Sequence, residues 1–425
     1  PLGVGLTYSV GWDDVSAGAA EIDLTETALS LDPFGWTKLP GVPGRAFVRF
    51  HSSDEGVLSV PEFDVSADDL FLKGGAHFRI GDDTFALRDI QFSQLRFGDN
   101  DVVAAVDWPE NGVPAISLGG NTIDLRPVME LVFGDEADAE NEEDGSAPAM
   151  RIVVSEKTPI GSIRLGAETR LQGAYGTLVS DGVNWSPVLL RGKLSNAGNM
   201  FVQIEPEGDL RRVLIETDDA GGLLNALDWV NTIKTGELRV RGTFAGTGDE
   251  EVFSGQVDAQ GFVLTEEPFA AQILALASFS GIADVLGGEG ITFRRAEVPF
   301  QMTKDEIVIK DAKARGAEIG IITSGKIDRN AETLSLEGEV APAYTLNSLL
   351  ANIPLIGQVL SGGSEGIFAA TFAATGPLSD PQVSVNPLSV LTPGIVRRLL
   401  SGFEGDALGE TEPALPVPVA PEISQ

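Results

Sequence analysis

The 425-residue sequence contains no cysteine. This absence excludes disulfide bonds, thiol catalysis and zinc–thiolate sites, but it does not choose between the cytoplasm and the periplasm. Histidine is scarce as well, and both copies, His51 and His77, stand in strand-like contexts. Two isolated histidines do not make a catalytic metal site, so we expect them to be sheet-surface residues. The sequence predicts no metal and no cofactor.

Recognisable catalytic motifs are also missing. The chain has neither a P-loop nor a G-x-G-x-x-G run, so nothing indicates nucleotide chemistry. The stretch GGSEG at 362–366 matches the G-x-S-x-G pattern of a hydrolase nucleophile. That motif needs a strand before the serine and a helix after it, whereas Ser364 is expected to follow a helix and precede a strand. We therefore predict that the protein is not an enzyme.

Positive charge is in short supply. Lys and Arg number 29 against 63 Asp and Glu, which gives a net charge of −34. Nucleic acid is therefore a poor partner, because phosphate binding needs clustered basic residues. Attraction to an anionic bilayer by bulk charge is disfavoured for the same reason. The acidic run at 134–148 lacks the glycine of a calcium loop and is expected to be a flexible, solvated loop.

No uninterrupted hydrophobic run reaches membrane-spanning length. A spanning helix needs about 20 mostly apolar residues. The best candidate, 268–286, is broken by polar or small residues: Gln272, Ser278, Ser280, Gly281 and Asp284. We expect it to be an amphipathic helix that packs on the protein, and any membrane anchor to lie outside this chain.

What the sequence has in quantity is alternation with a period of two. GELRVRGTF at 236–244 and ETLSLEGEV at 332–340 place apolar and polar side chains on opposite sides, and RVLIETDD at 212–219 repeats the theme. TFALRDIQF at 84–92 does the same, with a one-residue slip at Arg88 that predicts a β-bulge. One apolar face and one wet face are typical of an antiparallel sheet. Helices are expected only at 220–230 (after a cap at Asp218 or Asp219), 268–286, 346–363 and 393–403.

The apolar face of such a sheet needs a cover. Roughly 50–60 helical residues are too few for about 25 strands, which would extend on the order of 100 Å. The sheet must either fold on itself or curl around a non-protein apolar ligand. Alternation alone predicts these inward-facing residues, which could equally fill an ordinary core: Leu238, Val240, Phe244, Ile307, Ile309, Leu334 and Leu336.

Three long stretches carry a family resemblance. They are FAAQILALASFSGIADVLGGEGITFRRAEVPF (269–300), AYTLNSLLANIPLIGQVLSGG (343–363) and GPLSDPQVSVNPLSVLTPGIVRRLL (376–400). They resemble the C-terminal region of AsmA-like, YhdP-type envelope proteins, in the bridge-like lipid transfer family. The resemblance is clear over 215–403 and looser over 20–210. It implies an elongated, curved antiparallel β-groove of the repeating type with a few amphipathic helices.

The resemblance also implies a function. Such proteins are tethered to the inner membrane by an N-terminal helix, here outside the chain, and shield phospholipid or other acyl lipid on the way to the outer membrane. We therefore expect periplasmic lipid transfer that supports the outer-membrane barrier. Two alternatives stay open: an envelope protein with a closed β core that has a structural or assembly role, and a carbohydrate-active β-sandwich enzyme.

The chain divides into five expected segments. β-groove segments at 1–133 and 149–217 flank the acidic loop at 134–148, an AsmA-like groove region covers 218–403, and a disordered Pro-rich acidic tail covers 404–425. A terminal amphipathic helix would cap the groove or contact a membrane, or else pack on the last strands with its arginines in solvent. Its residues are Ile395, Val396, Arg397, Arg398, Leu399, Leu400 and Phe403.

Overall fold

The computed structural model describes residues 3–10, 16–31, 34–53, 56–81, 84–127, 149–166, 170–194, 198–226, 232–265, 290–317, 319–342 and 370–386. In these ranges 23 strands form one sheet, and β3 and β4 form a separate two-stranded sheet. The pairing is antiparallel almost throughout. The expected fold class, an elongated antiparallel sheet with few helices, is therefore confirmed.

The strands of the first half run in chain order: β1 (Gly3–Val10), β2 (Ser16–Asp23), β3 (Leu29–Leu31), β4 (Trp36–Lys38), β5 (Gly44–Ser53), β6 (Val57–Ala67), β7 (Leu70–Ile80), β8 (Phe85–Phe97), β9 (Asn100–Asp107), β10 (Ala115–Asp124), β11 (Met150–Val154), β12 (Ile160–Arg164) and β13 (Arg170–Ser180). The rest are β14 (Trp185–Leu194), β15 (Asn199–Glu207), β16 (Leu210–Thr217), β17 (Ile233–Lys234), β18 (Glu237–Ala245), β19 (Val252–Leu264), β20 (Ile291–Met302), β21 (Glu306–Gly316), β22 (Ile319–Asp328), β23 (Thr333–Pro342), β24 (Ala370–Pro377) and β25 (Gln382–Asn386).

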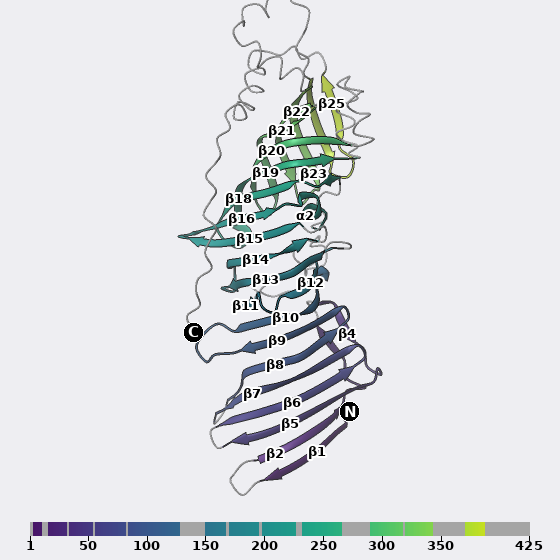
Figure 1. The fold of residues 1–425 in the computed structure, drawn as a ribbon, viewed down its shortest axis with the longest axis vertical. Coiled ribbons are helices and arrows are strands. Elements are labelled where there is room, and N and C mark those ends of the chain that lie inside the picture. Colours follow the sequence, from purple (N-terminus) through teal and green to yellow (C-terminus); the bar gives the residue numbers. More distant parts are fainter. Residues whose placement is uncertain are drawn as a thin grey trace, which may run out of the picture.

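The strands stack as a meander along the long axis of the molecule (Figure 1). Most strands pair with their neighbours in the chain, so β1 and β25 lie at the two ends of the stack. The strand direction turns from nearly horizontal at β5 to nearly vertical at β22 in that view. This accumulated rotation is the usual twist of a large sheet.

One place departs from the predicted antiparallel pattern. β10 pairs in parallel with β11 through Ala115–Leu118, and again in parallel with β12 through its second half. A parallel pair needs a crossover of a dozen or more residues. The connection at 125–149 is long enough to supply it, and the acidic run predicted at 134–148 lies within that connection, outside the described residues.

Local sequence signals explain two smaller features. The bulge expected at Arg88 is confirmed, because Phe78 lies opposite Leu87 while His77 lies opposite Asp89. Helix α2 (Ala220–Ala226) begins after Asp219, whose Oδ1 accepts a hydrogen bond from the Gly222 amide at 2.9 Å. This is an N-cap, as the sequence predicted. The other predicted helices and Ser364 lie outside the described residues.

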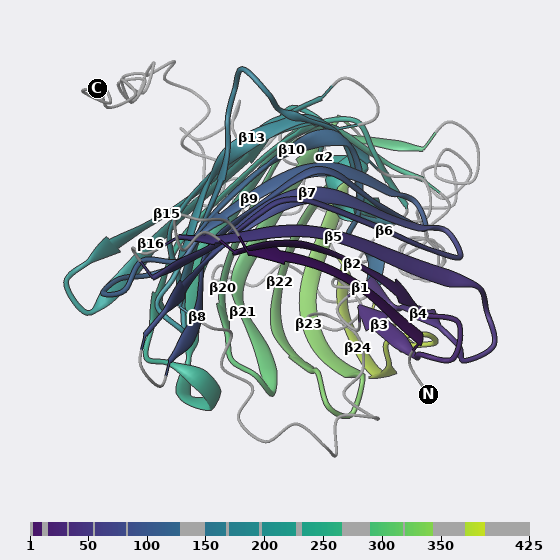
Figure 2. The same cartoon turned by 90° about the horizontal axis from the view of Figure 1, so that it is seen from below.

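The sheet is bent into an arch when viewed from the β1 end (Figure 2). Burial distinguishes its two faces. Ion pairs such as Arg49–Glu62 and Arg239–Glu216 stand on one face with largely exposed side chains. The opposite face carries the buried apolar side chains. Because bending crowds the side chains of the inner face, we assign the apolar face to the hollow of the arch.

Candidate functional site

The apolar face is organised in rows that run across the strands. In a β-ladder, directly opposed residues point to the same side, so the strand register shows which side chains follow one another along the stack. Three such rows lie side by side. We call them the central row, the inner row and the outer row.

The central row passes without interruption from β6 to β25. Its members are Val60, Ala76, Ile90, Val106, Ile116, Ile152, Leu178, Val188, Ile204, Val213, Gly242, Gly255, Phe300, Ile309, Gly325, Leu336, Ala374 and Val383. Every member is apolar or glycine, and none is exposed. At about 4.8 Å between strands the row is roughly 80 Å long.

The inner row runs beside it and reaches the other end of the ribbon. Its members are Leu6, Ala20, Val48, Phe63, Gly74, Phe92, Ala104, Leu118, Val154, Gly176, Leu190, Val202, Ile215, Val240, Val257 and Val298. The central and inner rows together carry an apolar surface from β1 to β25.

The outer row belongs to the same apolar face and lies on the side of the central row opposite the inner row. Its members are Pro206, Arg211, Phe244, Phe253, Met302, Ile307, Ile327, Leu334 and Gly376. Arg211 is the one charged residue in the three rows.

All seven residues predicted to face inward lie on this one face. Ile309 and Leu336 belong to the central row, Val240 to the inner row, and Phe244, Ile307 and Leu334 to the outer row. Leu238 lies next to Val240 on the far side from the central row and is buried. Their role towards a lipid stays a prediction. The predicted terminal helix at 395–403 lies outside the described residues.

The strand ends on the Leu238 side form a closed margin. Two apolar clusters follow it, one around Leu171, Leu194 and Leu223 of α2, the other around Ile291 and Val340. The β3–β4 hairpin adds Trp36, which packs on Leu70 and Phe97. These clusters reach onto the apolar face, because Val154 of the inner row belongs to one of them and Ile215 and Val240 pack against it.

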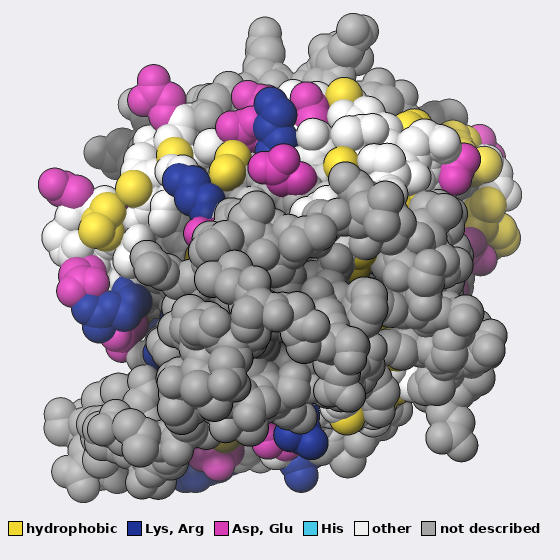
Figure 3. Space-filling view, turned by 90° about the horizontal axis from the view of Figure 1, so that it is seen from above, with side chains coloured by type: hydrophobic (Ala, Val, Ile, Leu, Met, Phe, Trp, Pro, Cys, Tyr) yellow, Lys and Arg dark blue, Asp and Glu magenta, His cyan; other side chains and the backbone are white. Residues whose placement is uncertain are grey.

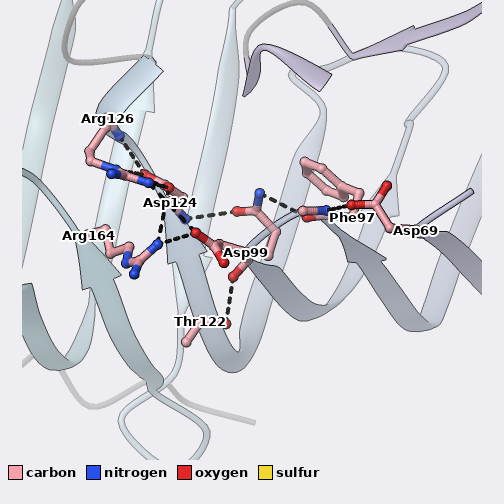
Figure 4. Close-up of polar contacts among 9 residues, drawn as sticks. Asp69, Phe97, Asp99, Thr122, Asp124, Arg126 and Arg164 are labelled. Carbon is pink, nitrogen blue, oxygen red and sulfur yellow. Dashed lines mark hydrogen bonds and ion pairs between the residues drawn. The ribbon is translucent and has the colours of Figure 1, made fainter. Parts of the chain in front are cut away.

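A series of hydrogen bonds and ion pairs connects strands along the same margin (Figure 4). Asp69 accepts hydrogen bonds from the Trp36 indole and the Gly98 amide, at 2.6 and 3.0 Å. At the end of β10, Asp124 is hydrogen-bonded to Arg126, whose Nε lies 2.9 Å from Oδ1. That hydrogen bond, followed by the hydrogen bond from the Arg126 amide and then the charges of Arg126 and Arg164, lowers the pKa of the Asp124 carboxyl despite its burial.

The opposite, open margin is built differently. The connections that the structure describes in full on this margin are short turns, such as 208–209 between β15 and β16 and 181–184 between β13 and β14. The connection that leads to β11 lies largely outside the described residues. These turns are too short to fold over the apolar rows. Large apolar side chains are exposed at or beside the turns along it: Ile80, Phe85, Trp108, Val113, Val183, Leu210 and Leu378. The apolar face therefore has a covered side and a side with an apolar rim.

The outer face of the sheet is polar. Seen from the β25 end, its described Lys and Arg side chains lie beside Asp and Glu (Figure 3). His77 Nδ1 lies 2.7 Å from Asp89 Oδ1 on this face. His51 is on the same face, because Ser59 lies opposite both histidines, and it is exposed, as expected of a surface residue. A shallow hollow of about 390 Å³ includes Asp311 and Glu337. No group of three or more metal-ligating side chains occurs in the described ranges.

Sequence reasoning missed Arg211. The alternation predicted from RVLIETDD starts at Arg212, whereas β16 begins two residues earlier, at Leu210. Extending the period of two from Ile215 and Val213 would have placed Arg211 on the apolar face. That signal was available, but a charged residue reads as the end of an apolar pattern.

Comparison of the chain with protein-family models, with curated proteins and with solved structures finds no match. Among the helices that the structure describes, none has the length and apolar character needed to cross a membrane.

Proposed function

We propose that the apolar face binds the acyl chains of lipids and that the protein is a passive conduit or carrier for them. The observation that carries this proposal is the unbroken central row, with the inner row beside it. Each acyl CH₂ removed from water is worth about 0.8 kcal/mol, so a sixteen-carbon chain gains on the order of 10 kcal/mol on full burial. A surface that is apolar along its whole length lets a chain shift from strand to strand without re-entering water.

The glycines of the central row make room for aromatic rings on the same face. Gly242 and Gly255 lie opposite each other. A Cβ on Gly242 would lie 2.5 Å from the Phe253 ring, and one on Gly255 would lie 3.3 Å from the Phe300 ring; the two rings are in edge contact, with centroids 5.2 Å apart. The apolar surface therefore continues through these positions as phenyl rings.

The cellular setting is part of the proposal. The resemblance to AsmA-like envelope proteins supports a periplasmic location between the inner and outer membranes, with phospholipid as the cargo and a membrane tether outside this chain. Fractionation of cells that express the native protein tests this. Recovery in the cytoplasm would refute the location.

A second candidate is a floor that protein fills, as in a structural envelope protein. The burial of Val213, which is 3% exposed, and of Ala374, which is 0% exposed, favours it. The two candidates differ in what co-purifies. A lipid-binding floor retains phospholipid, seen as discrete added mass in native mass spectrometry, whereas a filled floor retains none.

Photo-crosslinking makes a sharper test, because it reports direct contact between a chosen side chain and the lipid. A benzophenone amino acid replaces Ile204 or Ile309 on the central row, and the controls are their sequence neighbours Gln203 and Val308 on the outer face. After illumination with phospholipid vesicles, we expect lipid adducts at the two floor positions and not at the two controls. Equal labelling at all four positions, or none at any, would refute acyl-chain binding on this face.

A further inference from the structure

Arg211 is an unusual residue for the position it holds. It belongs to the outer row, among Pro206, Phe244 and Phe253, and its side chain is 14% exposed. Placing a cation on an apolar face costs free energy through desolvation. A methionine or leucine would fill the same space, so the charge calls for an explanation.

The contacts of Arg211 use little of its hydrogen-bonding capacity. Its Nη2 is paired with the Glu251 carboxylate, and its guanidinium lies over the Phe244 ring, 4.9 Å from the centroid. Phe244 stacks in turn on Phe253, with centroids 4.5 Å apart. A guanidinium has five N–H donors in a planar fork. Within the described residues, Glu251 is its one acceptor.

The position of Arg211 along β16 matters as much as its contacts. Val213 and Ile215 follow it on the same face, in the central and inner rows, and Leu210 is exposed at the rim beside it. Two residues of a strand span about 7 Å. A lipid with its chains on Val213 and Ile215 would therefore bring its headgroup to Arg211, at the open margin.

We propose that Arg211 binds the phosphate of a phospholipid whose acyl chains lie on the apolar rows, with the phosphate taking the place of Glu251. This assignment rests on the proposed function and adds the headgroup chemistry to it. A planar guanidinium can hold two phosphate oxygens at once, which suits it better than lysine for this task. The Phe244 ring holds the guanidinium plane. The displaced Glu251 carboxylate, whose side chain is 32% exposed, turns to water when the phosphate replaces it.

The chain offers a matched control one residue away. Arg212 lies on the outer face and pairs with Glu207, so it has the same charge and the same kind of partner without the apolar surroundings. The comparison uses Arg211→Met, Arg212→Met and Glu251→Gln. The probes are phosphatidylglycerol and diacylglycerol with identical acyl chains, competed against each other and quantified by native mass spectrometry.

We expect the unmodified protein and Arg212→Met to prefer phosphatidylglycerol over diacylglycerol. Arg211→Met should reduce that preference about tenfold, since a hydrogen bond to a charged group contributes at least that factor. Glu251→Gln, which weakens the competing ion pair, should raise it. Diacylglycerol binding itself should change little in any variant.

The outcomes separate the two proposals. If none of the proteins binds either lipid, the proposed function fails. If both lipids bind but Arg211→Met keeps the wild-type preference, the headgroup assignment fails. Arg211 would then have a structural role only, through its ion pair with Glu251 in the turn before β19. The assignment would also be overturned if millimolar inorganic phosphate, which has no acyl chain, displaced phosphatidylglycerol as strongly as a competing phospholipid does. Should Arg211→Met not fold, Arg211→Lys keeps the charge without the fork and should still lower the preference.

Discussion

The strongest stability prediction concerns a lysine buried at the closed margin. Lys38, in the β3–β4 hairpin, is 1% exposed. Its ammonium donates to the backbone carbonyls of Leu24, Thr25, Thr27 and Leu39, at 2.9, 3.2, 2.9 and 3.3 Å. Four carbonyl dipoles stabilise the ammonium, whose charge also acts on the nearby Asp23 carboxylate. The lysine thereby connects the segment before the hairpin to the segment after it.

The substitution Lys38→Met keeps most of the apolar stem and removes the donors. Hydrogen bonds to a charged group contribute about 1.5–3 kcal/mol each, but relief of the ammonium's desolvation offsets part of the loss. Some of the carbonyls also regain water. We therefore expect a net loss of about 3–5 kcal/mol, because each carbonyl left buried without a donor costs about 1–3 kcal/mol.

The loss should appear as local opening, because β3 and β4 form a sheet of their own, separate from the long ribbon. Hydrogen exchange measured on peptides that cover 29–38 should accelerate a hundredfold or more, at about 1.4 kcal/mol for each factor of ten. The control is Lys73→Met, which removes only an exposed pair with Asp64. If the two variants exchange alike over 29–38, the carbonyl cage does not hold the hairpin and the reasoning is wrong.

Two further predictions test the closed margin. The pKa of Asp124 is lowered in the folded state, so its ion pairs with Arg126 stabilise the fold above the unfolded carboxyl pKa of about 4 and are lost as pH falls below it. Asp124→Asn should therefore lower the unfolding temperature at pH 7. Below pH 4 the unfolding temperature of this variant should fall less steeply with pH than that of the unmodified protein, and equally steep falls in both would refute this. Leu194→Ala, at a fully buried position, should cost about 2–5 kcal/mol in denaturant unfolding, against a small change for the exposed Leu189→Ala, and equal effects would contradict a core on this side.

Much of the fold could be predicted from local patterns. The period of two in GELRVRGTF places Leu238, Val240 and Phe244 on one face whatever their partners are, and the slip at Arg88 marks a bulge within a single strand. These features depend on neighbours in the chain, which a sequence displays directly.

The features that sequence reasoning missed depend on distant contacts. The parallel pairing of β10 with β11 is set by where the chain returns after 125–149, and alternation reads the same in either direction. Lys38 looks like an ordinary surface residue in WTKLP, because its carbonyl partners lie up to 14 positions away. The rows themselves exist only in the register of successive strand pairings, which the alternation within any one strand does not determine.

The division between the two margins resolves a conflict in the proposed function. A protein that keeps its core in the middle of a sheet would have to be emptied to admit a lipid, at a cost comparable to unfolding. Here the clusters around Leu194 and Val340 stabilise the ribbon from one side, while short turns and an apolar rim border the other. Stability and lipid binding are then separable at the two margins, although the inner row contributes to both: changes such as Leu194→Ala should weaken the fold, whereas changes at Arg211 should alter which lipid is held.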